Sequence, residues 1–330
     1  MIVRAIFPNR VYADLVFDVT LLFVFTYAMV TKHFLWYTWI FVGLILVRLY
    51  FDLMEYFIFQ RPEKFRKETL QIKGWKDHTR IVKGYNIHYH LYHGRKDKPL
   101  IVFLHGWRSS SGRMKNRIQQ FVNLDWSICA IDLPNHGSSD AVKKWSAEFS
   151  STCIIEILNG LDYSNTNQKL IIYGHSIGGF IALRLCKRMM EWEKTVNLQA
   201  LILESPMTKY SYILQRAYRA LKVPQVLRSL MDRRIFFTVN RLHTISSNFN
   251  SIHDADIPRW GMPTCSLMIL QAGTDTQLGR SHYEDFLFEL SASSTEFESH
   301  LIDSLSHSGG DQNQERSILI ERFLKRQNLY

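Results

Sequence analysis

The stretch Leu170-Ile171-Ile172-Tyr173-Gly174-His175-Ser176-Ile177-Gly178-Gly179 decides the fold of this 330-residue chain. Apolar, mostly branched residues predict a buried strand, which ends at a serine flanked by glycines, and a helical pattern follows at once. Gly174 and Gly178 leave room where the strand and the helix approach each other. The turn would hold the Ser176 hydroxyl clear of the sheet, within reach of a histidine on one side and a substrate on the other. The stretch therefore predicts a nucleophilic serine on a strand–turn–helix unit.

The chain on either side of this stretch alternates between predicted strands and helices. The expected strands are 80–82, 86–92, 99–104, 126–131, 170–173, 200–203, 266–271 and 297–302. The expected helices are 113–122, 147–161, 177–192, 283–290 and 314–326. The first two strands flank Lys83-Gly84-Tyr85, which is typical of a hairpin. The alternation predicts an α/β fold, with a mostly parallel sheet covered by helices on both faces.

Residues 207–257 differ from this alternation. They are helix-like and aromatic, and they carry eight basic and three acidic side chains. We interpret them as a helical cap, inserted over the ends of the strands.

Three elements of the sequence match a known pattern. His105-Gly106 follows one strand, Ser176 lies in its glycine-flanked turn, and an aspartate and then a histidine follow the last two strands. From about Thr79 to its end, the chain resembles the α/β-hydrolase family. The likeness is closest to the lysophospholipase and monoacylglycerol-lipase-like branch, also called serine aminopeptidase-like, which has a helical cap.

The resemblance implies a role for each of five residues. Ser176 would be the nucleophile, His307 its general base, and Asp275 the acid that orients His307. The backbone amides of Trp107 and Ile177 would form the oxyanion hole.

Two other acids follow predicted strands and remain alternatives to Asp275. Glu204 ends the strand after the nucleophile helix, where some related enzymes keep their acid. Asp303 is only four residues before His307, at the end of the last strand, and is the weaker alternative. A dehalogenase or an epoxide hydrolase would have aspartate in place of Ser176, which argues against both classes.

The other histidines suggest structural roles. His88, His90 and His93 are close enough in sequence for a metal site, but no carboxylate or cysteine accompanies them in the sequence, so we favour an exposed hairpin face. His105 and His136 are expected to support loops. The sequence predicts no metal ion and no cofactor.

The N-terminal sixty residues lie outside the resemblance and are predominantly apolar. Residues 11–30 and 34–51 are long enough for two transmembrane helices, which would form a hairpin. Asp14 and Asp18 lie within the first stretch and are costly in hydrocarbon. A single span, or a hairpin that dips into the membrane without crossing it, therefore remains an alternative.

The excess of basic side chains behind the net charge of +10 lies in one segment of the chain. Residues 61–115 carry fourteen basic and four acidic side chains, which accounts for the whole excess. Positive charge beside a membrane segment explains this better than nucleic-acid binding, and it places both termini in the cytosol. We expect residues 61–78 to form a basic linker and residues 79–330 to form the hydrolase domain. The four scattered cysteines predict free thiols in a reducing compartment.

The sequence thus predicts a membrane-anchored serine hydrolase that cleaves lipid-like carboxylic esters, such as lysophospholipids or monoacylglycerols. An amidase, a peptidase or an acyltransferase could use the same residues. A membrane scaffold or binding protein on a hydrolase fold is the alternative of another class. The sequence identifies no protein partner and no acyl-chain preference.

Overall fold

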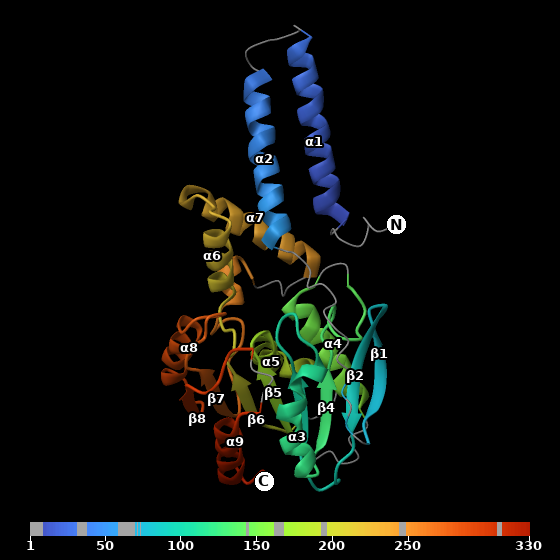
Figure 1. Ribbon diagram of the computed structural model, residues 1–330, viewed down its shortest axis with the longest axis vertical. Coiled ribbons are helices and arrows are strands. Elements are labelled where there is room, and N and C mark those ends of the chain that lie inside the picture. The colour runs from blue at the N-terminus through green and yellow to red at the C-terminus, as the bar shows by residue number, and fades with distance from the viewer. Residues whose placement is uncertain are drawn as a thin grey trace. The chain divides into compact units, whose positions relative to one another are not determined.

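The computed structural model describes most of the chain, in several ranges. These are residues 9–31, 38–58, 70, 72, 74–142, 145–161, 168–192, 197–243, 249–308 and 312–330. The chain forms two compact units (Figure 1). The helical unit comprises residues 1–61 and 214–242, and the sheet unit comprises residues 62–213 and 243–330.

The sheet unit is built on an eight-stranded sheet in the order β1-β2-β4-β3-β5-β6-β7-β8. The strands are β1 (Lys76–Val82), β2 (Tyr85–Tyr92), β3 (Leu100–Leu104), β4 (Ser127–Ile131), β5 (Lys169–His175), β6 (Asn197–Glu204), β7 (Ser266–Ala272) and β8 (Phe297–Ile302). The pairs β1–β2 and β2–β4 are antiparallel, and all the others are parallel. The predicted α/β fold with a mostly parallel sheet is confirmed, and all four cysteines are free.

Helices cover the sheet because its strands bury side chains on both faces. Its helices are α3 (Lys115–Asn123), α4 (Ala147–Gly160), α5 (Ile177–Lys187), α8 (Ser281–Ser291) and α9 (Gln314–Arg326), with short 3-10 turns at Ser111–Met114, Met189–Glu191 and Ile252–Ala255. On one face, Phe103 and Tyr173 belong to a buried cluster with Phe121 of α3 and Phe323 of α9. The alternate strand residues, such as Ile172, are equally buried. Full burial of this kind is typical of parallel strands.

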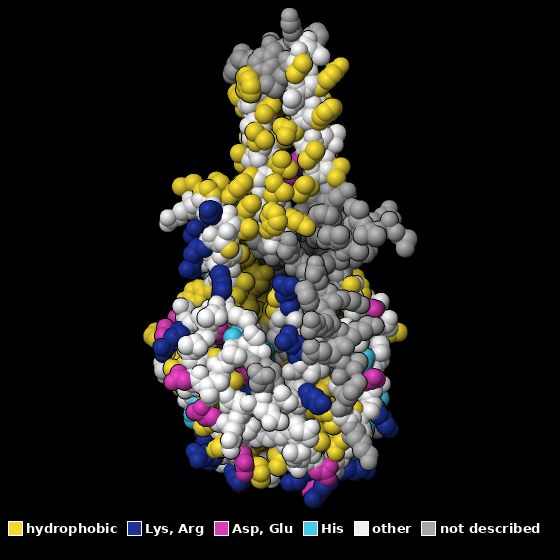
Figure 2. All heavy atoms as spheres, viewed as in Figure 1, with side chains coloured by type: hydrophobic (Ala, Val, Ile, Leu, Met, Phe, Trp, Pro, Cys, Tyr) yellow, Lys and Arg dark blue, Asp and Glu magenta, His cyan; other side chains and the backbone are white. Residues whose placement is uncertain are grey.

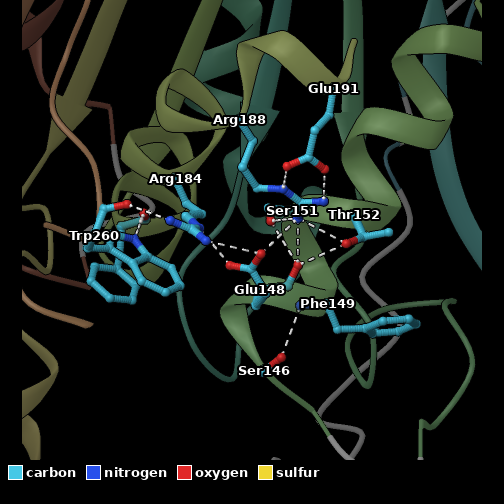
Figure 3. A network of polar contacts seen from close by, with 10 residues as sticks. Ser146, Glu148, Phe149, Ser151, Thr152, Arg184, Arg188, Glu191 and Trp260 are labelled. Carbon is cyan, nitrogen blue, oxygen red and sulfur yellow. Dashed lines mark hydrogen bonds and ion pairs between the residues drawn. The ribbon is translucent and has the colours of Figure 1, made fainter. Parts of the chain in front are cut away.

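A polar network joins α4 to α5, the helix that follows Ser176 (Figure 3). The guanidinium of Arg184 donates to Glu148 at 2.6 Å and to the carbonyl of Trp260 at 3.1 Å. Arg188 donates to the hydroxyl of Ser151 at 2.6 Å. Because Arg184 is buried, its charge depends on the Glu148 carboxylate for compensation. The network therefore holds in place the helix on which the serine turn rests.

The helical unit contains α1 (Asn9–Val30), α2 (Thr38–Ile58), part of α6 (Tyr210–Ala220) and nearly all of α7 (Gln225–His243). Arg48 of α2 pairs with the buried Asp18 of α1 at 2.9 Å. Arg234 of α7 pairs with Glu55 at 2.7 Å and also with Asp52, both on α2. Part of the predicted cap therefore packs with the N-terminal helices. The predicted limits of the cap, the linker and the domains remain predictions, and most of the linker lies outside the described residues.

The prediction of membrane spans at 11–30 and 34–51 must be corrected. Helices α1 and α2 cover residues 11–30 and 38–51 of these stretches, and residues 34–37 lie outside the described residues. In the described part of the chain no helix is long and apolar enough to cross a membrane. The apolar sequences are interrupted by charged side chains, Asp18 in α1 and Arg48 and Asp52 in α2, which pair with one another and with α7.

Candidate active site

The serine turn between β5 and α5 is a strained backbone feature. Ser176 has φ 54° and ψ −117°, a conformation that costs a non-glycine residue about 1–3 kcal/mol. Four backbone hydrogen bonds hold it, one of them from the amide of Ser176 to the carbonyl of Glu204 at 3.0 Å. A Cβ on Gly178 would lie 2.1 Å from the carbonyl oxygen of Leu104, and one on Gly174 would lie 2.7 Å from Gly179. The glycines thus have the spatial role that the sequence predicted.

The structure brings together the three side chains that the resemblance singled out. The hydroxyl of Ser176 lies 3.1 Å from His307 Nε2, and His307 Nδ1 lies 2.8 Å from Asp275 Oδ2. Ser176 follows β5, Asp275 follows β7 and His307 follows β8, so the parallel strands carry them to one edge of the sheet. All three are buried. With Nδ1–H donating to the carboxylate, Nε2 is left to accept the serine proton.

Asp275 is held in its ionised form. Its carboxylate accepts hydrogen bonds from the amides of Gln277 and Leu278, both at 2.9 Å, and from the side chain of Gln271 at 3.1 Å. Burial alone would raise the pKa of Asp275, but the hydrogen bond from His307 and the two amides lower that pKa to about 2. The carboxylate is therefore charged at neutral pH and can stabilise an imidazolium.

Glu204, the first alternative acid, is occupied elsewhere. It is buried and accepts a hydrogen bond from Arg117 Nε at 2.9 Å and another from the hydroxyl of Tyr173, and it pairs with Arg316 at 3.5 Å. Burial favours the neutral acid, yet the Arg117 guanidinium holds the pKa of Glu204 well below its usual range. This carboxylate compensates two buried guanidinium groups. Asp303, the second alternative, is exposed.

The loop after β3 lies against the serine turn. A Cβ on Gly106 would lie 2.7 Å from His175 Nδ1 and 3.4 Å from the Cβ of Ser176. The next residue in the loop is Trp107, and Ile177 follows the serine. Among the hydrogen bonds of the described residues, neither of these two amides donates to another part of the protein. Two unengaged amides beside a nucleophile suit a developing oxyanion.

His175 has a role that the sequence did not reveal. Its half-buried side chain donates from Nε2 to the backbone carbonyl of His307 at 2.6 Å, and its other ring nitrogen faces Gly106. Burial, followed by the charge of Arg117, lowers the pKa of His175 to about 3, so the ring is neutral. The side chain thus links the loop after β3 to the loop that carries His307. No local signal predicts this, because the contact joins residues far apart in the sequence.

Two other histidines support the loops, as the sequence predicted. His105 is fully buried and its ring hydrogen-bonds loop backbone on both sides. His136 accepts a hydrogen bond from the amide of Arg108 at 3.1 Å. The ring of Trp107 packs edge-on against His136 and Trp145, with centroids 5.3 Å and 4.7 Å apart, and remains 39% exposed. Trp107 therefore forms a wall beside the serine turn.

Comparisons with known proteins agree with this arrangement. Residues 95–256 match the family model of serine aminopeptidase, S33. A Bacillus subtilis protein of the AB hydrolase superfamily is 32% identical over 106 residues, which cover 32% of this chain and 37% of the relative. A Danio rerio sn-1-specific diacylglycerol lipase is 23% identical over 167 residues, covering 49% of this chain and 51% of the relative. The chain thus spans about half or less of these relatives.

Among solved structures, a Pyrococcus furiosus esterase superposes with a TM-score of 0.55 at 15% sequence identity, covering 81% of this chain and 96% of the esterase. At that identity the likeness concerns the fold. The sheet order and the serine turn are those of the α/β-hydrolase fold, and the matched family model makes the chain similar to the lysophospholipase-like branch of that family.

Proposed function

We propose that this protein is a serine hydrolase that cleaves carboxylic esters through an acyl-enzyme. The hydrogen-bonded series from Ser176 through His307 to Asp275 carries the proposal, with steps of 3.1 Å and 2.8 Å. A serine hydroxyl needs such a base, and the base needs an oriented acid. The family similarity supports the same reaction class.

In the proposed mechanism Ser176 Oγ attacks the carbonyl carbon of the ester while its proton moves to His307 Nε2. The imidazolium is stabilised by Asp275, and the amides of Trp107 and Ile177 donate to the oxyanion. When the tetrahedral intermediate collapses, the bond to the alcohol breaks and the alcohol leaves with the proton from His307. A water molecule then attacks the acyl-enzyme while its proton moves to the same nitrogen. Collapse of the second tetrahedral intermediate breaks the bond to Ser176 Oγ, which takes the proton back from His307 as the acid leaves.

We propose lipid-like esters as the substrates, such as lysophospholipids or monoacylglycerols, because the helical unit presents a large apolar surface. Hydrophobic side chains cover much of α1 and α2 (Figure 2). Those most exposed on the helical unit are Phe23, Tyr27, Val30, Leu44, Val226 and Phe237. Exposed apolar area of this extent is typical of surfaces that contact membranes or proteins. A named diacylglycerol lipase among the relatives agrees with a lipid substrate.

Labelling with a fluorophosphonate probe tests the catalytic proposal. We expect one adduct per chain, on Ser176, and no adduct in Ser176→Ala with an unchanged circular dichroism spectrum. Hydrolysis of p-nitrophenyl esters of graded acyl length, beside a lysophospholipid and a monoacylglycerol, would then define the substrate. A folded wild-type protein that takes no label would instead favour a scaffold without turnover. Labelling with hydrolysis of amides but not of esters would favour an amidase or a peptidase.

We also propose that the apolar surface of the helical unit binds a membrane, and flotation with lipid vesicles tests this separately. We expect the protein to float with vesicles containing anionic lipid, and the double variant Phe23→Asp/Leu44→Asp to float less. Met190→Asp is the matched control, because Met190 is 97% exposed but belongs to the sheet unit. Equal flotation of all three proteins would contradict membrane binding by the apolar surface of the helical unit. The cytosolic location of the sheet unit stays a prediction.

A further inference from the structure

Two histidines and a carboxylate meet on one face of the β1–β2 hairpin. In the antiparallel register Asp77 of β1 lies directly opposite His90 of β2. His88 lies two residues before His90 on β2, so its side chain is on the same face of the sheet. From the sequence we expected an exposed hairpin face without a carboxylate. That expectation was wrong on both points, because His90 is only 2% exposed and two carboxylates, Asp77 and Asp132, contact the histidines.

The geometry of this cluster is that of a chelating set. His90 Nδ1 lies 2.6 Å from Asp77 Oδ1, and His88 Nε2 lies 3.9 Å from the same oxygen. The two imidazole centroids are 4.5 Å apart, and one ligand atom from each residue can be chosen so that all lie within 4.8 Å of one another. Tetrahedral zinc with bonds of about 2.0–2.1 Å holds its ligand atoms roughly 3.3–3.5 Å apart. Small side-chain rotations would reach that spacing.

The cluster also has the outer support that metal-binding histidines need. His88 Nδ1 lies 3.1 Å from the buried Asp132 Oδ2 and donates its proton there, which leaves the Nε2 lone pair facing Asp77. A carboxylate behind the ring fixes the tautomer and the orientation of a ligand histidine. Asp132 is itself held by the hydroxyl of Ser111 at 2.7 Å and the amide of Ser138 at 2.9 Å. The arrangement is therefore prepared before any ion binds.

We propose that Asp77, His88 and His90 bind a divalent transition metal ion of the Zn²⁺ class. The set supplies two imidazole nitrogens and one carboxylate oxygen, a combination that suits zinc. The side chain of Asp77 is 69% exposed, so solvent reaches the site and water can occupy the fourth position. Through His88, the ion would join β1 and β2 to Asp132, which begins the loop after β4.

The position of the site gives the ion a structural consequence. Residues 132–139 form the loop after β4, and within it His136 accepts the amide hydrogen bond of Arg108, the neighbour of Trp107. An ion bound to His88 would hold the hydrogen bond between His88 and Asp132 in place, and would so stabilise this loop together with β1 and β2. Because the ion binds the folded hairpin and not the unfolded chain, it should also raise the melting temperature.

Equilibrium dialysis of the full chain tests the proposal, with Zn²⁺ and Co²⁺ as probes and no polyhistidine tag. We expect one ion per chain, tetrahedral visible bands with Co²⁺, and a higher melting temperature with Zn²⁺. Asp77→Asn retains an exposed residue of the same size and should fold. It should weaken binding by about 10- to 100-fold and abolish the rise in melting temperature.

His93→Ala is the matched control, because His93 directly follows β2 but lies outside the cluster, and it should bind like wild type. His88→Gln should weaken binding as Asp77→Asn does. Equal Zn²⁺ affinity in wild type and Asp77→Asn, or no saturable binding near one ion per chain, would overturn the proposal and leave a hydrogen-bonded histidine–aspartate pair. Neither outcome depends on hydrolase activity, so the proposed function is tested independently.

Discussion

Separate replacement of two buried acids by their amides tests which of them serves His307. Asp275→Asn removes the charge that lies 2.8 Å from His307 Nδ1 and allows the wrong imidazole tautomer. By analogy with other serine triads, kcat should fall by about 10⁴-fold. The depression of the Asp275 pKa from 3.8 to about 2 corresponds to roughly 2 kcal/mol of stability at 1.36 kcal/mol per pH unit. The variant should therefore remain folded but be nearly inactive.

Glu204→Gln should have the opposite effect. Its carboxylate accepts from Arg117 at 2.9 Å and pairs with Arg316 at 3.5 Å, and both arginines are buried. The amide keeps the shape but removes the negative charge that compensates these two buried guanidinium groups. Breaking a buried ion pair in this way costs about 3–5 kcal/mol. The free energy of unfolding should fall by that amount, while molecules that remain folded keep a near-normal kcat.

The assay must separate activity from stability. Urea unfolding followed by tryptophan fluorescence gives the free energy of unfolding of each variant. Titration with a fluorophosphonate counts the active sites, and for variants that react slowly the titration is followed until labelling is complete. The rate of ester hydrolysis is then divided by the number of active sites. Asp303→Asn is the control, since this exposed carboxylate should change neither quantity.

One result would refute the reasoning. If Glu204→Gln lowered kcat per site by a thousand-fold without loss of stability, and Asp275→Asn stayed within a few-fold of wild type, Glu204 would be the acid. The hydrogen bond between Asp275 and His307 would then be structural.

Three further predictions follow from the site and its surroundings. Gly178→Ala should abolish labelling and lower the melting temperature, because its Cβ would lie 2.1 Å from the carbonyl oxygen of Leu104; soluble, fully labelled protein would contradict this. His175→Leu removes the donor to the His307 carbonyl, so kcat should fall by about 2- to 10-fold, the value of one hydrogen bond, with KM unchanged. The free energy of unfolding should decrease as the pH is lowered from 6.5 to about 3, because burial lowers the pKa of both His175 and His136 to about 3. In that window the unfolded state binds more protons than the folded state, at up to about 1.4 kcal/mol per pH unit for each ring, and stability should be level above pH 6.5; urea unfolding across this range that showed no such slope would contradict it.

The parts of this structure that the sequence could predict are those governed by local patterns. The strand before Ser176, the turn and the helix after it are adjacent in the chain, and their glycines report the space available. The positions of Asp275 and Glu204 show where such reasoning ends. Glu204 ends one of the parallel strands and Asp275 follows the next, so spacing alone could not choose between them. Only the side-chain partners, His307 for one and Arg117 for the other, distinguish the two.

Contacts between distant segments account for what the sequence missed. The link from His175 to His307 and the carboxylates around His88 depend on strand register and loop packing. In the N-terminal region, apolar composition predicted membrane spans. The structure shows that two of the charged residues within those stretches, Asp18 and Arg48, pair with each other. Composition records that such residues are present, but it does not record what they bind.

The discontinuity of the helical unit constrains how this protein can be shortened. Residues 214–242 pack with the N-terminal helices, and Arg234 meets Asp52 and Glu55 there. A version that begins after Arg61 would remove the two carboxylates that pair with the α7 guanidinium. Such a truncation invites aggregation even though it spares every residue near Ser176. An engineer who wants the sheet unit alone must therefore remove or redesign both segments together, and any ancestor that gained one of them would have had to accommodate the other.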